Sequence, residues 1–152
     1  DWKIFERRKI VKSDIPESFY QKIIGKGTPV RVYCTTGCMD RLKSQEMGIA
    51  LLSGNNPVQL TELVNYLQRA GGYQEKSYHP ILPPYTVFNQ QPQPDAQLLG
   101  QTSTKYVVSP YGLDDANLEL MDEGNGYKLY ENKAVIMPFS DHYFFVSLPG
   151  KS

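Results

Sequence analysis

The chain has 152 residues, of which 40% are hydrophobic and 21% are charged, and sixteen Lys and Arg residues balance sixteen Asp and Glu residues. This length is ordinary for one domain, so we expect a single domain over residues 1–152. The balanced charge excludes a global electrostatic attraction to nucleic acid or anionic lipid, and the sequence has no apolar run near the ~18 residues that a membrane span needs.

Helix and strand signals alternate in the first part of the chain. Ser13 is a plausible N-cap, and the helical spacing of Ile15, Phe19 and Ile23 predicts a short helix up to residue 24. The stretch "PVRVYC" at 29–34 alternates its side chains between two faces, which predicts a strand. A second helix is expected to begin near Cys38, directly after this strand.

A third helix has the clearest pattern in the chain. Asn56 can cap it, Pro57 suits its first position, and Gly71 ends it. The expected buried stripe consists of Leu60, Leu63, Val64 and Leu67.

The second part of the chain begins with a proline-rich segment, 73–101, which predicts a long ordered loop or a lid rather than an interdomain linker. After it, β-forming runs predict strands at 105–109, 127–130, 134–137 and 142–148, whereas "DDANLELM" at 114–121 suggests one or two helical turns. The expected fold class is α+β, with a helical N-terminal half packed on a C-terminal antiparallel sheet.

The two cysteines pose the main functional question. Cys38 at a helix start is a candidate nucleophile, because a helix N-terminus favours the thiolate, and His142 at the start of a strand is the candidate base. The C-x3-C spacing of Cys34 and Cys38 equally allows a local disulfide in an oxidising compartment, or two partly buried thiols.

Two segments resemble papain-like bacterial cysteine peptidases of the bacteriocin-leader-processing type. They are "GCMDRLKSQEMGIALLSGNNPVQLTELVNYL" and "ENKAVIMPFSDHYFFVSL", in the order of that family. The resemblance implies a papain-like fold and a peptidase or amidase activity, with Cys38 as nucleophile and His142 as base. The family's oxyanion-holding Gln is replaced by Val32.

Three shorter patches resemble ADP-ribosyltransferase toxins. They are "RVYCTT", "QTSTKY" and "ENKAVIMP", and the resemblance implies an NAD site with Glu131 before an apolar strand. The family's Arg would stand at the position of Cys34, with Arg31 close by, and the paired-glutamate motif is reduced to Glu131 with Lys133 two residues later.

The non-enzymatic alternative is an interaction domain of a secreted or periplasmic protein that binds a protein or peptide partner. The candidate anchors are aromatic residues in or near irregular chain: Tyr73, Tyr78, Tyr85, Phe88, Tyr106 and Tyr111. We expect no cofactor and no metal site, because His79 and His142 lie far apart and neither has a second ligand beside it. The basic patch "ERRKIVK" fits a solvated edge strand better than a phosphate contact, so no nucleic-acid partner is expected.

Overall fold

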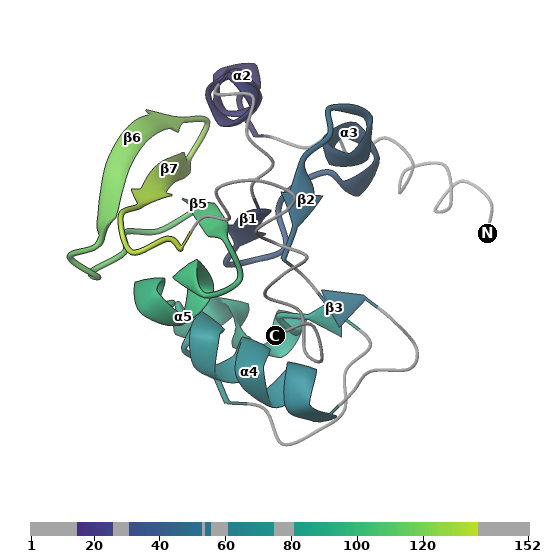
Figure 1. Ribbon diagram of the computed structural model, residues 1–152, viewed down its shortest axis with the longest axis vertical. Coiled ribbons are helices and arrows are strands. Elements are labelled where there is room, and N and C mark those ends of the chain that lie inside the picture. The colour runs from purple at the N-terminus through teal and green to yellow at the C-terminus, as the bar shows by residue number, and fades with distance from the viewer. Residues whose placement is uncertain (1–14, 26–30, 53, 56–60, 75–80, 137–152) are drawn as a thin grey trace, which may run out of the picture.

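The computed structural model describes residues 15–25, 31–52, 54–55, 61–74 and 81–136 (Figure 1). They form a five-stranded mixed sheet in the order β2-β1-β5-β7-β6 and a separate antiparallel pair, β3 with β4. The strands of the large sheet are β1 (Arg31–Cys34), β2 (Ala50–Leu51), β5 (Thr104–Ser109), β6 (Leu118–Gly124) and β7 (Tyr127–Asn132). The small pair joins β3 (Gly54–Asn55) to β4 (Ile81–Leu82).

Helices lie on both faces of the large sheet, so the molecule has three layers. Figure 1 shows α2 (Glu17–Ile24) and α3 (Arg41–Glu46) above the sheet, and α4 (Thr61–Gly71) and α5 (Ala96–Gly100) below it. A 3₁₀ helix, η1 (Tyr85–Gln90), precedes α5 along the chain.

The fold class is α+β, as the sequence predicts. The sheet, however, contains parallel and antiparallel strand pairs, whereas the sequence predicts an antiparallel sheet. β1 runs parallel to both β2 and β5, whereas β7 runs antiparallel to β5 and β6. The antiparallel part, β5-β7-β6, contains two of the expected C-terminal strands, as β5 and β7, together with β6, which was not expected. The N-terminal half therefore contributes strands to the sheet as well as helices packed on it.

β1 separates two hydrophobic cores because it is buried on both faces. Val32 and Cys34 pack with α2, and Tyr33 packs on the other face with α4 and α5. The predicted alternation along this strand is correct, and each set of side chains has its own core. In α2, Phe19, Tyr20 and Ile23 are the buried face, although the proposed cap Ser13 lies outside the described residues.

The third predicted helix is present as α4, and Leu67 and Ala70 are its buried residues. Val64 is partly buried against the same core. The predicted start of this helix, including Asn56, Pro57 and Leu60, lies outside the described residues, as does the side chain of Leu63.

Two local predictions are wrong. The helix expected near Cys38 begins at Arg41, because Asp40 is its N-cap and accepts a hydrogen bond from the Lys43 backbone N–H at 2.9 Å. The helical turns expected at 114–121 are replaced in part by β6. Asn125 and Gly126, at φ 53° and 83°, form a tight turn that pairs β6 with β7.

The predicted strand at 127–130 is β7, and the one at 105–109 is β5. By contrast, residues 134–136 are not part of a strand, and residue 137 and the predicted strand 142–148 lie outside the described residues. The proline-rich segment contains β4, η1 and α5. Between η1 and α5, two of its residues form hydrogen bonds with the chain that follows β5. Tyr111 Oη donates to the Pro92 carbonyl at 2.6 Å and Gln93 Nε2 donates to the Gly112 carbonyl at 3.0 Å.

Candidate functional site

Cys34 and Cys38 form a disulfide at the carboxyl end of β1, with their Cα atoms 5.7 Å apart. This separation lies within the usual range for a disulfide. A turn brings the two residues together: the Gly37 N–H donates to the Cys34 carbonyl at 3.1 Å, and Gly37 has a φ of +63°. A positive φ is accessible to glycine at no steric cost. Of the alternatives that the sequence left open, the structure therefore has the local disulfide.

The two sulfurs have different surroundings. Cys34 is buried, whereas Cys38 is only partly buried and lies beside an exposed Gly37. A hydroxyl accompanies the buried sulfur, because Thr36 Oγ1 lies 3.6 Å from Cys34 Sγ. The disulfide thus joins one buried cysteine, whose sulfur lies beside a hydroxyl, to one partly buried cysteine.

A hydrogen-bond network fixes the chain just after Cys34. The Thr35 N–H donates to the Val108 carbonyl at 3.1 Å, which extends the β1–β5 ladder by one residue. The Thr35 hydroxyl donates to Ser109 Oγ at 3.1 Å, and the Tyr111 N–H donates to the same oxygen at 3.2 Å. The ends of β1 and β5 are therefore joined by side chains as well as by the sheet.

Three tyrosines lie together on the α4 side of this end of the sheet. Burial raises the pKa of Tyr33 well above its ordinary value, and the neighbouring Tyr73 and Tyr111 raise that pKa further. A β-carbon placed on Gly71 would lie 2.7 Å from Tyr33 Oη and 2.6 Å from a Tyr73 ring carbon, so these groups are in close contact. Among the described residues, the Tyr33 and Tyr73 hydroxyls have no hydrogen-bond partner.

The disulfide occupies a distinctive place in the topology. The connection from β1 to β2 runs through α3 on one face, and the connection from β2 to β5 runs through α4 and α5 on the other face (Figure 1). The disulfide thus lies at the carboxyl end of β1, beside the carboxyl end of the parallel strand β5. In open α/β sheets, ligands characteristically bind outside the carboxyl ends of the strands. Sequence reasoning identified Cys34 and Cys38 here and named Tyr111 only as a candidate anchor. It missed Thr35 and Ser109, which are 74 positions apart in the chain.

The predicted catalytic pair cannot be assembled from the described residues. Cys38 is held in the disulfide, and His142 and His79 lie outside the described residues. Val32, at the position of the family's oxyanion Gln, is fully buried in the core. The nucleophile of a cysteine is its thiolate, and a sulfur in a disulfide is not a thiolate, so Cys38 cannot act as the nucleophile in this state.

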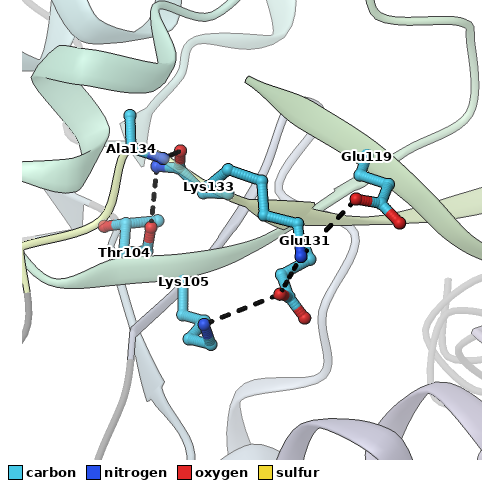
Figure 2. Close-up of polar contacts among 7 residues, drawn as sticks. Thr104, Lys105, Glu119, Glu131, Lys133 and Ala134 are labelled. Carbon is cyan, nitrogen blue, oxygen red and sulfur yellow. Dashed lines mark hydrogen bonds and ion pairs between the residues drawn. The ribbon is translucent and has the colours of Figure 1, made fainter. Parts of the chain in front are cut away.

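A second polar cluster lies at the other end of β5 (Figure 2). The buried Glu131 carboxylate on β7 is 2.7 Å from Lys133 Nζ and 3.8 Å from Lys105 Nζ, and Lys133 also lies 3.5 Å from Glu119. Of the three patches that resemble ADP-ribosyltransferases, one contains β1, one contains the start of β5, and one begins at Glu131, near the end of β7. The Glu131 carboxylate, however, is neutralised by two lysines, which suits a structural ion-pair network rather than a free catalytic carboxylate.

The described residues contain no helix that is long and apolar enough to cross a membrane. They also contain no group of three or more His, Cys, Asp or Glu side chains arranged to hold a metal ion. No protein-family model, characterised protein or solved structure matches this chain.

Proposed function

We propose that this chain is a protein- or peptide-binding domain of a secreted or periplasmic protein. The observation that carries the proposal is the Cys34–Cys38 disulfide, which takes up both cysteines of the chain. Disulfides form and persist in oxidising compartments, which supports a location outside the cytosol. The same bond removes the free thiol on which a papain-like hydrolase depends.

Burial sorts the aromatic residues that could anchor a partner. Tyr73, Tyr106 and Tyr111 are buried, and Tyr78 lies outside the described residues. In contrast, Tyr85 is 68% exposed and Phe88 is partly exposed. Of the described candidates, these two are the ones that a partner can reach, and exposed aromatics in an ordered setting are typical anchors of protein interfaces.

The 3₁₀ helix presents this aromatic pair in a fixed arrangement. Val87, between the two aromatics, is 1% exposed and holds η1 against the body of the domain. The Tyr85 and Phe88 rings contact each other edge to face, with 5.3 Å between their centroids. Because the pair is already ordered, a partner would bind it at a small entropic cost.

The papain-like alternative requires two changes from the arrangement described above. The disulfide must be reduced, and His142 must lie within hydrogen-bond reach of Cys38. The ADP-ribosyltransferase alternative requires Glu131 to leave its two lysines. We propose neither of these two functions. Counting free thiols in the denatured purified chain distinguishes the papain-like hydrolase from the binding domain. Two free thiols favour a hydrolase, and none favours the disulfide-containing binding domain.

The binding proposal is tested by site-specific photo-crosslinking. A photoreactive phenylalanine analogue is placed at position 88 of the full chain, and a matched variant carries it at Leu42, which is 73% exposed on α3. After irradiation with extracellular or periplasmic extract, we expect a discrete adduct from position 88 that falls at least tenfold in a Tyr85→Ser background. The same adduct pattern from both positions, or an adduct insensitive to Tyr85→Ser, would contradict an interface at η1.

A further inference from the structure

The Cys34–Cys38 disulfide closes an unusually short loop, with only Thr35, Thr36 and Gly37 between the two cysteines. The entropy that a disulfide removes from the unfolded chain decreases as the loop shortens, so a bridge of this length is a weak staple. The chain it joins is also held by other contacts, because Thr35 pairs with Val108 and Ser109 and Gly37 bonds back to Cys34. The contribution of this bond to the stability of the fold is therefore at the low end for disulfides.

Accessibility distinguishes the two sulfurs as partners for an incoming thiol. Cys38 is partly exposed, and its neighbour Gly37 has open space around it, since a β-carbon built there meets no atom within 4 Å. Cys34 is 6% exposed. A thiolate that attacks a disulfide needs access to one sulfur along the S–S axis, and the other sulfur leaves. Cys38 is thus the less buried of the two cysteines, and we take its sulfur as the point of attack.

The surroundings of Cys34 suit a leaving sulfur. The Thr36 hydroxyl, 3.6 Å from Cys34 Sγ, can donate a hydrogen bond to a thiolate there. Hydrogen-bond donation stabilises the charged form of a thiol, and a more stable thiolate leaves faster. The Thr35–Ser109 contact keeps the backbone beside Cys34 in place when the S–S bond opens.

We propose that the Cys34–Cys38 pair is a redox-active site that exchanges with the thiols of a dithiol peptide or protein. A substrate thiolate attacks Cys38 Sγ, a mixed disulfide forms on Cys38, and the electron pair of the broken S–S bond goes to Cys34. The second substrate thiolate then attacks the substrate sulfur of the mixed disulfide, and the electron pair goes to Cys38. The substrate loses two electrons and two protons and becomes a disulfide, and Cys34 and Cys38 become thiols.

This activity goes beyond binding at η1 and uses a different group of residues. It also differs from the hydrolase hypothesis, because the reacting form is the disulfide and no base is required. The disulfide lies at the carboxyl end of β1, beside that of the parallel strand β5, and ligands of open α/β sheets bind outside the carboxyl ends of the strands.

The test uses the oxidised full chain with reduced glutathione as the probe at pH 7. After brief reaction and acid quenching, peptide fragmentation of residues 32–41, which tryptic cleavage after Arg31 and Arg41 releases, locates the glutathione. We expect at least ten times more glutathione on Cys38 than on Cys34. Equal labelling of both sulfurs, or labelling mainly on Cys34, would overturn the proposal, and this measurement needs no variant.

The role of Thr36 is tested by a matched pair of substitutions. Thr36→Val removes the hydroxyl at nearly constant volume, whereas Thr36→Ser keeps it. We expect the rate of disulfide opening by glutathione to fall at least threefold in Thr36→Val and to stay near the wild-type rate in Thr36→Ser, with unchanged circular dichroism in both. Equal rates in the two variants would overturn the assignment of Cys34 as the stabilised leaving sulfur.

A Tyr85→Ser variant should exchange with glutathione at the wild-type rate. Failure of the proposed interface at η1 and failure of the proposed disulfide-exchange site are therefore distinguishable.

Discussion

The Thr35 hydroxyl donates a hydrogen bond to Ser109 Oγ at 3.1 Å, across 74 positions of the chain, and both residues are fully buried. This contact joins the residue that follows β1 to the last residue of β5. Ser109 Oγ also accepts from the Tyr111 N–H, so one hydroxyl oxygen satisfies two buried donors. The position of the disulfide loop relative to β5 depends on this oxygen.

Ser109→Ala should therefore be costly for such a small change. It leaves the Thr35 hydroxyl and the Tyr111 N–H without their acceptor, and an unsatisfied buried polar group costs about 1–3 kcal/mol. We expect the free energy of unfolding in urea to fall by about 2–4 kcal/mol.

Ser18→Ala is the matched control for that substitution. Ser18 Oγ donates to Asp122 at 3.0 Å in an exposed setting, where water can replace the lost contact. We expect a change of less than about 0.5 kcal/mol. Equal effects of the two substitutions would show that the Ser109 network does not hold the strand ends.

Local patterns predicted the elements whose signals lie within one segment. α2 and β1 follow from the spacing of Phe19, Ile23 and Val32, and α4 follows from Leu67 in its apolar stripe. The strand order was not predictable, because the parallel pairing of β1 with β5 joins residues about seventy positions apart. The Thr35–Ser109 contact depends on that pairing and has no sequence signature.

The cysteine question could be posed from the sequence but not answered. The spacing of Cys34 and Cys38 is compatible with thiols or a disulfide, and the deciding feature is the turn at Gly37 that brings them together. Conversely, β6 had a readable signal that the prediction missed. The dipeptide Asn125-Gly126 is a strong hairpin signal. The β6 sequence itself, LELMDEG, has no β-branched or aromatic residue, so only the turn indicated the hairpin.

Gly126→Ala tests that hairpin. Gly126 has a φ of +83°, where a β-carbon is strained, so we expect a loss of about 1–2 kcal/mol in the free energy of unfolding. Gly112 is the control, because a β-carbon there meets nothing within 4 Å and its φ is not in the left-handed region. Gly112→Ala should be neutral within about 0.5 kcal/mol. A neutral Gly126→Ala would mean that the turn adopts another conformation.

The disulfide makes a measurable but limited contribution to stability. For a loop of this length the chain-entropy model gives about 2 kcal/mol, so Cys38→Ser and the Cys34→Ser/Cys38→Ser double variant should each lose about that amount. The wild-type chain measured in reducing agent should match the double variant. A loss above about 4 kcal/mol would show that the bond is a principal staple of the fold.

Tyr33 and Tyr111 should respond in opposite ways to loss of the hydroxyl. Tyr33 Oη is buried and has no partner among the described residues, so Tyr33→Phe removes a desolvated polar group and should be neutral or stabilising by up to about 1 kcal/mol. Tyr111 Oη donates to the Pro92 carbonyl at 2.6 Å, so Tyr111→Phe should lose about 1 kcal/mol. Urea unfolding of both variants decides the comparison. A destabilised Tyr33→Phe would indicate that its hydroxyl binds a buried water.

Buried tyrosines should make the fold sensitive to alkaline pH. Burial is the main cause of the raised pKa in a set of five: Tyr33, Tyr66, Tyr73, Tyr106 and Tyr111. An unfolded tyrosine releases its proton near pH ~10, while the folded chain still retains it. The unfolded state then binds fewer protons than the folded state, so the free energy of unfolding falls as the pH rises.

We therefore expect the contribution of these tyrosines to stability to be fully present below about pH 9 and to be lost progressively above about pH 10. Urea unfolding between pH 7 and pH 11 measures the decline, and phenolate absorbance of the native chain should show a group of tyrosines that ionises only as the fold is lost. Tyr33→Phe should make the decline shallower, because it removes one group with a strongly raised pKa. If all the tyrosines of the native chain ionised together near pH ~10 with the fold intact, the cluster beneath the carboxyl end of β1 would be open to water.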